Sequence, residues 1–391
     1  MAQDAGAPPP GDGDLLGIGM VGYAFMGRAH SQAWRTVGHF FDLPRSPRMA
    51  AICGRDRAAV AAAAERLGWA AWETDWKRLV DRDDVELVDV CTPGSSHAEI
   101  SIAALEAGKH VLCEKPLANT VEEARAMAAA ADRAAARGVR AMVGFNFRRV
   151  PAVALARELV AAGRLGTVRQ VRAAYLAPHA VDPAFPLAWR FRAEAAGSGA
   201  LGDLGAHAVD LAQHVAGDRI AGVAALTGTF VKERPLPDGS GSGPVTVDDA
   251  ALFVARFGGG ALGSFEATRL AAGHAEGLRV EVNGSLGSLI WELESLNHLL
   301  FFDGAGERAT QGFRRIQVTR AEHPYAAAWW PDGHTIGYEH TFTHEVRDLL
   351  EAIARGADPA PTFADGLQVQ QVLDAVLRSA SSGSAWTEVG T

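Results

Sequence analysis

The sequence predicts an α/β chain of two domains: an N-terminal parallel sheet covered by helices on both faces, then an α+β domain with a large, mostly antiparallel open sheet. From Leu15 to about Phe147, short continuous apolar runs alternate with helical Ala- and Glu-rich segments, which is the rhythm of βαβ units. After Arg149 the strands lengthen and alternate apolar with polar residues, as antiparallel strands do. The 391 residues also exceed the usual size of a single core, since domains average about 150 residues.

The apolar runs of the first domain have the length of buried strands. They are Leu15 to Val21, Met49 to Cys53, Val85 to Cys91, His110 to Cys113 and Arg140 to Phe145. Residues 1–13 contain Pro, Gly, Ala and Asp without periodicity, so we expect a disordered leader there and the first domain at 14–149. The three cysteines fall at or near strand ends without a Cys-x-x-Cys pair, which predicts buried structural thiols.

The second domain, residues 150–391, is predicted to begin with a helix from Pro151 to Ala161 and a strand from Val168 to Leu176. Later strands with glycine-bearing turns between them predict an antiparallel meander: Ala250 to Phe257, Ala261 to Thr268, Leu278 to Asn283 and Ser288 to Leu293. Helices are expected from about Glu339 to Ile353 and from about Asp365 to Ala380. One face of this sheet stays free, so we expect helices or a second subunit to cover it.

Composition and charge narrow the class of ligand. The net charge of -9 at pH 7 is spread along the chain without a basic block, which argues against nucleic acid or an anionic membrane as a partner. No uninterrupted apolar run reaches the roughly 18 residues that span a bilayer, and the first residues lack a basic region followed by an apolar one. We therefore expect a cytoplasmic protein that binds small molecules.

A glycine-rich turn follows the first predicted strand. Gly22, Ala24 and Gly27 occupy the three glycine positions of a dinucleotide fingerprint, directly after a strand and at the start of a helix. Amides at such a helix start bind a pyrophosphate, so we expect this turn, with Phe25 and Met26, to bind NAD or NADP. Ala24 carries a methyl group where a glycine normally lets the backbone approach the phosphates. The alternative is a glycine-rich turn that binds no ligand.

The end of the second strand leaves the choice of cofactor open. NAD-specific proteins usually carry an acidic residue there, but this strand leads into Gly54, Arg55 and Asp56. Arg55 can bind a 2′-phosphate or stack on adenine, which favours NADP, whereas Asp56 can still reach the ribose. Alternatively, Arg55 is a solvated loop residue.

Two further segments are predicted to border the cofactor. Thr92 and Pro93 follow the fourth strand, and His97 begins the next helix and is expected to face the cofactor cleft, although a lone histidine there is more often structural. Glu114 and Lys115 end the fifth strand before a proline, which holds the preceding residue extended. A lysine there can polarise a substrate hydroxyl and stabilise the developing alkoxide; the alternative is a surface lysine.

Asp203 and His207 are four residues apart, so they share one face if a helix runs from Gly202 to Ala216. An acid and an imidazole so placed form a pair for proton transfer, with His207 as the base that removes a hydroxyl proton. An acid at a helix start and a core histidine are the structural alternative. No third ligand with suitable spacing is evident, so no metal is predicted.

Together these motifs resemble the oxidoreductase family of glucose-fructose oxidoreductase, inositol dehydrogenase and the rhizopine-catabolism proteins, over nearly the whole chain after residue 14. Within the family the resemblance is greatest to the branch that oxidises the anhydrosugar levoglucosan. The segments that carry it are Ala24 to Ser31, Asn146 to Arg149, Pro186 to Phe191, Gly197 to Asp203, Glu266 to Arg269, His323 to Tyr325 and Phe363 to Gly366.

The resemblance implies hydride transfer between NAD or NADP and a secondary hydroxyl of a cyclic polyol, sugar, anhydrosugar or glycoside, for example at sugar carbon 3. It also implies that Lys115, Asp203 and His207 form the catalytic set, and that the chain assembles as a homodimer or homotetramer through the second sheet. The residues implied to line the sugar pocket, with Asp203 and His207, are Asn146, Arg148, His179, Trp189, Arg190 and Tyr338. Trp189 and Tyr338 can equally be packing residues.

Three departures from the family pattern stand out: Ala24 for glycine, Gly94 where asparagine is frequent, and a different polar set at Ala177 to His179. The last departure bears on the substrate. Two other functions use the same residues or the same fold: glycoside hydrolysis with a retained cofactor, and a non-catalytic dinucleotide-sensing regulator. A regulator would be marked by loss of Lys115 or His207, and both are present.

Overall fold

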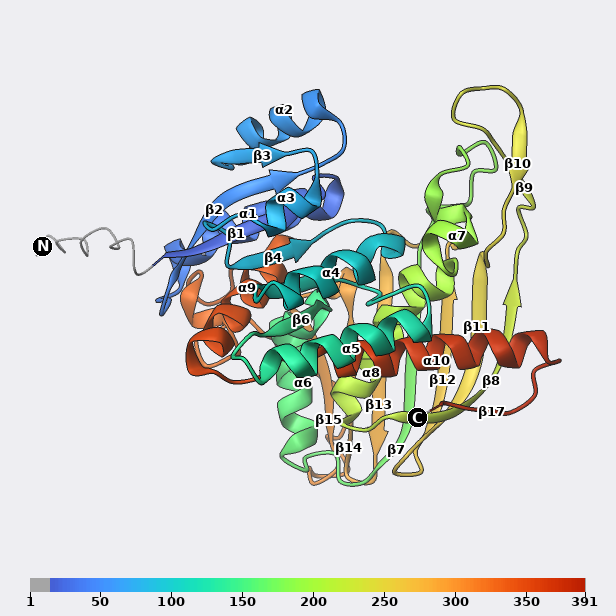
Figure 1. The fold of residues 1–391 in the computed structure, drawn as a ribbon. Coiled ribbons are helices and arrows are strands. Elements are labelled where there is room, and N and C mark those ends of the chain that lie inside the picture. Colours follow the sequence, from blue (N-terminus) through green and yellow to red (C-terminus); the bar gives the residue numbers. More distant parts are fainter. Residues whose placement is uncertain (1–14, 391) are drawn as a thin grey trace, which may run out of the picture.

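Two sheets of different strand direction carry the fold of this computed structural model, which describes residues 15–390 (Figure 1). The first is six-stranded, in the order β3-β2-β1-β4-β5-β6, and each neighbouring pair is parallel. Its strands are β1 (Leu15–Val21), β2 (Ser46–Cys53), β3 (Ala71–Glu73), β4 (Leu87–Val90), β5 (His110–Glu114) and β6 (Ala141–Gly144). The predicted leader, residues 1–13, lies outside the described residues.

Helices connect these strands as βαβ crossovers require. They are α1 (Phe25–Phe40), α2 (Arg57–Leu67), α3 (Trp76–Val80), α4 (His97–Glu106) and α5 (Val121–Ala135). The strand order reverses between β1 and β4, and a ligand of an open parallel sheet binds beside the carboxyl ends of the strands at such a reversal. The glycine turn after β1 and the Thr92 segment after β4 both lie at this point.

The second sheet has nine strands, in the order β16-β15-β14-β13-β7-β12-β11-β8-β17. In chain order they are β7 (Val168–Leu176), β8 (Ile220–Gly228), β11 (Ala250–Phe257), β12 (Leu262–Thr268), β13 (Gly277–Gly284), β14 (Gly287–Glu292), β15 (His298–Asp303), β16 (Arg314–Gln317) and β17 (Thr387–Glu388). A separate hairpin pairs β9 (Glu233–Pro235) with β10 (Ser242–Pro244).

The prediction of a simple meander was wrong in one respect. Strand β7 lies between β12 and β13, and its pairing with β12 is parallel, whereas its pairing with β13 is antiparallel. The sheet is therefore mixed, because a strand from early in the domain inserts between two later ones. The predicted fold class itself, a parallel dinucleotide-type sheet followed by a mostly antiparallel open sheet, is confirmed.

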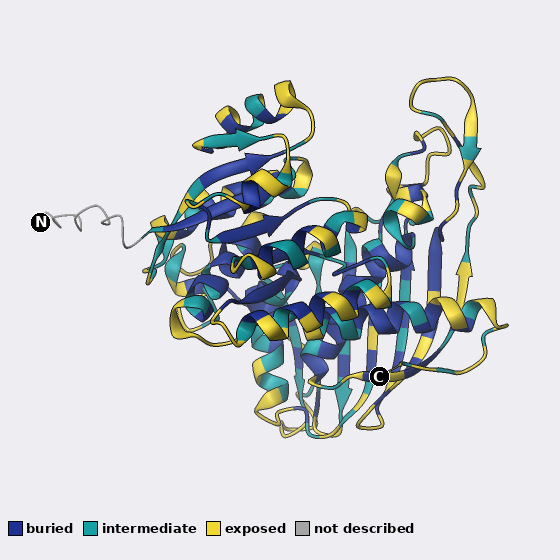
Figure 2. Cartoon of the chain, in the orientation of Figure 1, coloured by how far each residue is buried: buried dark blue, intermediate teal, exposed yellow. Residues whose placement is uncertain are grey.

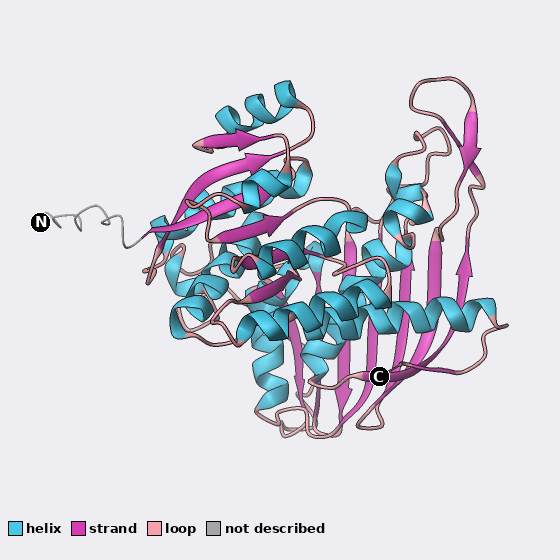
Figure 3. Ribbon diagram, in the orientation of Figure 1, coloured by secondary structure: helices cyan, strands magenta, loops and turns pink. Residues whose placement is uncertain are grey.

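One face of the second sheet is covered by helices, as Figures 1 and 3 show. The helices of this part of the chain are α6 (Pro151–Ala161), α7 (Ala193–Ala196), α8 (Ala206–Ala216), α9 (Tyr338–Arg355) and α10 (Phe363–Ser381). Helix α8 packs against β7 and α10 against β8. On the other face, outward residues such as Leu252 and Val254 of β11 are exposed and alternate with buried ones (Figure 2).

Helix α9 comes after residue 149 in the chain, but it packs against the first domain. Its residues Phe342, Val346, Leu349 and Leu350 are buried in one cluster with Leu16 of β1 and with α1. The chain thus returns from the second sheet to the first domain before α10 ends the fold. Residues of α9 therefore contribute to the wall of the cofactor domain, a contribution that strand patterns along the sequence do not reveal.

Two expectations about the chain as a whole can be compared with this structure. The three cysteines, Cys53, Cys91 and Cys113, are buried and free, as predicted. Among the described helices, none combines the length and the apolar character needed to cross a bilayer.

Candidate active site

The turn after β1 requires its two glycines. Gly22 has φ +107°, and a Cβ atom on it would lie 2.6 Å from the carbonyl oxygen of Cys91. A Cβ atom on Gly27 would lie 2.3 Å from the carbonyl oxygen of Gly22. Helix α1 starts at Phe25, and its N-cap residue Ala24 makes no side-chain cap, so the first amides of the helix have no side-chain acceptor there. This combination fits a bound pyrophosphate.

The end of β2 still leaves NAD and NADP open. Arg55 is exposed. Asp56 is the N-cap of α2, and its Oδ1 accepts a hydrogen bond from the amide of Ala59 at 2.9 Å. Its carboxylate is therefore partly engaged by the helix, whereas the guanidinium of Arg55 makes no hydrogen bond or ion pair with a described residue.

The structure corrects the expectation that His97 faces the cofactor cleft. The side chain is buried, with Nδ1 3.0 Å from the carbonyl oxygen of Pro116 and Nε2 2.8 Å from that of Thr92. Both ring nitrogens therefore contact main chain. His97 links the loop after β4, which includes Pro93, to the segment that carries Lys115, so it can shape the cofactor site only through these two loops.

Glu114 belongs to a buried ionic cluster under the same site. Its Oε2 accepts a hydrogen bond from the amide of Lys115 at 3.0 Å, and its Oε1 lies 3.0 Å from Nε2 of His30. The other ring nitrogen of His30 lies 2.9 Å from Oδ2 of Asp89, which also accepts a hydrogen bond from Trp34 at 2.7 Å. Both oxygens of Glu114 are thus used within the protein.

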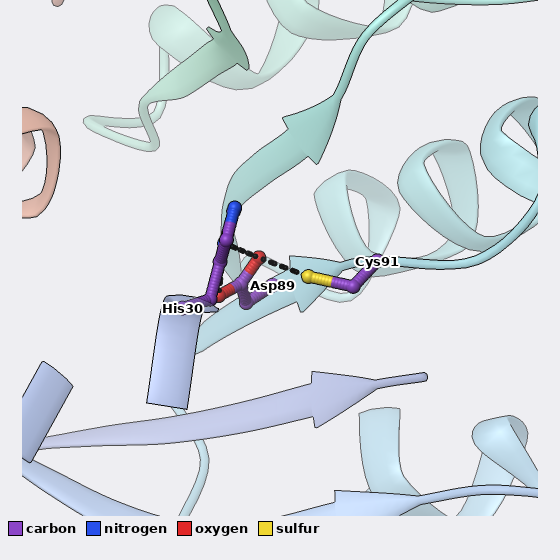
Figure 4. A group of neighbouring side chains, drawn as sticks. All are labelled: His30, Asp89 and Cys91. Carbon is purple, nitrogen blue, oxygen red and sulfur yellow. Dashed lines mark hydrogen bonds and ion pairs between the residues drawn. The ribbon is translucent and has the colours of Figure 1, made fainter. Parts of the chain in front are cut away.

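Cys91 completes the group that Figure 4 shows, where Asp89 lies between His30 and Cys91. The three ligand atoms lie within 4.8 Å of one another, a spacing that a metal ion could use. Burial disfavours the charged imidazole, but Asp89 outweighs it and the pKa of His30 is raised well above its usual value. Because a protonated imidazole has no free lone pair, this hydrogen-bonding pattern is that of an ion pair.

Lys115 links the end of β5 to the turn that carries Asp203. Its Nζ donates to the main-chain oxygen of Asp203 at 2.8 Å and lies 3.4 Å from Oδ1 of the same residue. The side chain is 14% exposed, so it is neither sealed in the core nor free in solvent. The sequence-based alternative of a surface lysine is therefore wrong.

Asp203 is surrounded by cations. Arg269 lies 3.3 Å and Arg190 3.8 Å from Oδ2, on the side away from Lys115. Burial alone would raise the pKa of Asp203, but Lys115, Arg269 and Arg190 lower it below the usual value. Asp203 therefore favours the carboxylate form, which faces three cationic side chains.

The segment that carries Asp203 is a π-helical turn, Leu201–Gly205, which runs into α8. The predicted helix from Gly202 to Ala216 is thus confirmed in extent but begins with wider turns. Asp248 anchors the turn, because its two carboxylate oxygens accept from the amides of Gly199 at 2.7 Å and Leu201 at 2.8 Å. A π-turn of this kind often marks a functional site.

His207 lies one turn further along and is 7% exposed. Rings of Phe145, Phe147 and Tyr175 lie 6.1, 4.9 and 5.9 Å from its ring. Burial and the charge of Lys115 hold the pKa of His207 well below its usual value, although Asp203 acts in the opposite direction. Neither ring nitrogen is hydrogen-bonded to a described residue, so a neutral imidazole keeps an available lone pair.

Two residues expected in the sugar pocket are engaged elsewhere. Asn146 is 2% exposed and donates to Oγ1 of Thr341 at 2.8 Å. Arg148 pairs with the buried Asp210, with Nε 2.9 Å from Oδ2. One donor of Asn146 and the guanidinium of Arg148 thus already have protein partners, and the place of both residues in a sugar pocket stays a prediction.

The other predicted pocket residues are at least partly exposed. Trp189 is 37% exposed, and the guanidinium of Arg190 lies 4.5 Å from its ring centre. Tyr338 packs against Phe25 with nearly parallel rings 6.3 Å apart, so it joins the glycine turn to the cleft. His179 forms an ion pair with a residue that the sequence did not single out, Glu276, at 2.8 Å.

The sequence assigned no role to three residues of the site, namely Arg269, Tyr175 and Glu276. Arg269 donates to the main-chain oxygens of Gly199 and Arg190 as well as to Asp203. Nothing local marks these three residues, since each acts on a partner far away in the chain. Arg269 does fall in one of the segments that carry the family resemblance, which was the available signal.

Comparison with known proteins identifies the family of this chain. Residues 16–145 match the family described as an oxidoreductase family with an NAD-binding Rossmann fold, and residues 153–290 match the GFO/IDH/MocA C-terminal domain. Levoglucosan dehydrogenase from Pseudarthrobacter phenanthrenivorans is 39% identical over 388 residues, which cover 96% of this chain and 98% of that enzyme.

Solved structures agree as well. The crystal structure of an oxidoreductase domain protein from Kribbella flavida superposes with a TM-score of 0.94 at 63% identity, covering 96% of this chain and 99% of that one. Levoglucosan dehydrogenase in complex with NADH and levoglucosan gives a TM-score of 0.92 at 40% identity, covering 96% and 99%. The chain therefore belongs to the glucose-fructose oxidoreductase, inositol dehydrogenase and MocA (GFO/IDH/MocA) family and is an NAD(P)-dependent oxidoreductase of sugar or polyol hydroxyls.

Proposed function

We propose that His207 is the base that takes the hydroxyl proton when a secondary alcohol of the substrate is oxidised. The observation that carries this proposal is the state of its imidazole: neutral, buried among aromatic rings and with ring nitrogens that no described residue occupies. A general base needs a free lone pair and a position within hydrogen-bond reach of the proton. Loss of the hydroxyl proton to His207 and of hydride from the same carbon would leave a carbonyl group on the substrate.

Lys115 and Asp203 have complementary roles in this proposal. The ammonium of Lys115 lies where it can donate to the substrate oxygen and stabilise the negative charge that develops on it. Asp203 holds that ammonium at 2.8 Å through its main-chain oxygen, and its carboxylate offsets part of the positive charge of Lys115, Arg269 and Arg190.

The glycine turn with Phe25 and Met26, Thr92 and Pro93, and the loop of Arg55 are the residues we assign to the dinucleotide. When bound, NAD or NADP accepts the hydride from the substrate carbon. Glu114 and His97 act on this site indirectly, since both are engaged within the protein.

The substrate class we propose is a cyclic sugar, anhydrosugar or polyol with a free secondary hydroxyl. Levoglucosan dehydrogenase, the relative above, was solved with levoglucosan, and the exposed Trp189 beside the cleft offers an apolar surface for the ring of a sugar. Levoglucosan is therefore the first candidate.

The test is to incubate the purified protein with NAD⁺ or NADP⁺ and a panel of levoglucosan, inositols, monosaccharides and aryl glucosides, and to follow the absorbance of the reduced nicotinamide. Reduction with one sugar supports the proposal and identifies the cofactor. Release of the aglycone without net cofactor reduction would instead indicate hydrolysis with a retained cofactor. Binding of a dinucleotide without reaction across the panel would indicate a regulator.

We further propose that a second copy of this chain covers the open face of the nine-stranded sheet. This face carries an apolar hollow of about 500 Å³ over the central strands β7, β8, β11 and β12, and the exposed side chains in and beside it are Leu226, Leu252, Val254 and Leu262. Contiguous apolar surface of this kind marks a protein interface. Light scattering of wild type and Val254→Lys tests this: a monomeric wild type contradicts the assignment.

A further inference from the structure

One carboxylate, Glu276, joins two further polar groups beside the proposed catalytic set. Its Oε2 accepts a hydrogen bond from the hydroxyl of Tyr175 at 2.7 Å, and its Oε1 lies 2.8 Å from Nε2 of His179. Tyr175 is on β7 and Glu276 precedes β13, its antiparallel neighbour in the sheet. His179 lies on the loop after β7, in the segment where the sequence departs from the family pattern.

These three residues connect to His207 through Tyr175. The ring of Tyr175 lies 5.9 Å from the ring of His207 and is buried. The hydrogen bond with Glu276 raises the pKa of His179, and the negative charge of Asp203 adds to this effect. Asp203 acts on Tyr175 as well. The set Tyr175–Glu276–His179 is therefore in electrostatic contact with the residues proposed to carry the reaction.

The two nitrogens of His179 are in different situations. Nε2 faces Glu276, whereas Nδ1 makes no hydrogen bond to any residue that the structure describes, and the side chain is 48% exposed. A carboxylate that binds one nitrogen fixes the ring orientation and the proton position. The other nitrogen is then held in a defined direction and is available to a ligand hydroxyl.

We propose that His179 is a specificity-determining residue that binds a second hydroxyl of the sugar, distinct from the one that is oxidised, and that Glu276 and Tyr175 are positioning residues for it. This inference rests on the proposed function and deepens it. An imidazole nitrogen can accept a hydrogen bond from a hydroxyl or donate one to it, according to protonation. The substrate is thus a polyhydroxylated ring, and an analogue that lacks the second hydroxyl would leave this nitrogen without its partner.

Tyr175 contacts both the proposed sugar-binding residues and the proposed base. Its hydroxyl holds Glu276, and its ring packs near the ring of His207. Replacement of the hydroxyl alone, in Tyr175→Phe, keeps the aromatic contact with the base and removes only the support of Glu276. It therefore separates a positioning role from a packing role.

The test compares His179→Ala with a matched control, His274→Ala. His274 forms a similar exposed pair with Glu294, at 3.5 Å and with side chains 43% exposed on both sides. With the best sugar of the wild type, we expect KM for the sugar to rise about tenfold in His179→Ala, the size of one lost substrate hydrogen bond of about 1.4 kcal/mol. KM for the dinucleotide and the melting temperature should stay unchanged, and the control should match the wild type.

Two further variants examine the positioning role. Glu276→Gln should raise KM for the sugar several-fold with kcat nearly constant, and the double variant with His179→Ala should be no worse than His179→Ala alone, since both act through one contact. Tyr175→Phe should show a smaller increase of the same kind. On a sugar analogue without the second hydroxyl, wild type and His179→Ala should have equal kcat/KM.

The outcomes separate this inference from the proposed function. If the wild type oxidises a sugar and His179→Ala retains its KM, His179 is not a specificity residue, while the proposed function stands. An additive double variant overturns the positioning role of Glu276. If the wild type oxidises no sugar of the panel, the proposed function fails and this inference fails with it.

Discussion

Glu114 and Lys115 are consecutive residues at the end of β5, yet their side chains belong to two ionic clusters of opposite character. Glu114 faces into the first domain, where His30 and Asp89 are buried. Lys115 faces the cleft, where it contacts Asp203 beside His207. Each cluster contains a histidine and at least one carboxylate, so the residue types alone do not distinguish the two clusters.

The two clusters differ in the charge state and the hydrogen-bond partners of their histidines. Asp89 raises the pKa of His30 despite its burial, and both ring nitrogens of His30 face carboxylates. Burial and Lys115 lower the pKa of His207, and its nitrogens are unoccupied by described residues. One imidazole is a cation held between anions, and the other is a neutral base that faces the cleft. Substitutions in the two clusters should therefore separate stability from chemistry.

The largest effect is expected for His207→Ala. Loss of a general base should lower kcat/KM by roughly 10²- to 10⁴-fold, while the affinity for the dinucleotide stays close to that of the wild type. Steady-state kinetics with the best sugar, together with fluorescence titration of the cofactor, measures both quantities. Turnover at the wild-type rate would remove His207 from the proposed mechanism.

Lys115→Met should lower kcat by roughly 10²- to 10³-fold, the cost of one lost donor to a developing oxyanion. The methionine keeps most of the side-chain volume, so thermal unfolding should change little. A variant whose KM rises while kcat is unaffected would show that Lys115 only binds the substrate.

Substitution in the buried cluster of His30, Asp89 and Glu114 should have the opposite effect, on stability and not on turnover. His30→Gln leaves Asp89 and Glu114 buried without their cation, which should lower the free energy of unfolding by about 3–5 kcal/mol. The folded fraction should retain kcat within a few-fold, since His30 does not face the cleft. Urea unfolding and single-turnover kinetics test the two parts. A variant that is fully stable but inactive would contradict the distinction between the clusters.

The smallest expected effect is in the pH profile. Because the folded pKa of His207 lies well below 6.5, its base form persists as the pH falls from about 8 to 6.5. We therefore expect kcat/KM to stay level over this range and to decline only in more acidic solution. Lys115 contributes to the lowered pKa, so in Lys115→Met the decline should begin at higher pH. An acid limb of the wild type centred at 6.5 would identify another titrating base.

Local sequence determined much of this protein. Short stretches of sequence are enough to predict the buried strands, the turn with Gly22 and Gly27, the placement of Lys115 after β5 and the spacing of Asp203 and His207. Each of these features depends on the conformation of a few neighbouring residues: an apolar run makes a buried strand, a positive φ demands glycine, and four residues make one helical turn.

Tertiary structure alone decided the partners of these residues. Arg269 meets Asp203 across 66 residues, Glu276 meets Tyr175 across 101, and β7 inserts parallel to β12. The contact of His97 with the main chain of Pro116 and the packing of α9 against the first domain also join segments that are distant in the sequence. Such contacts depend on strand order, on register and on which face each helix buries. These quantities are set by the packing of the whole chain, so no short pattern in the sequence contains them.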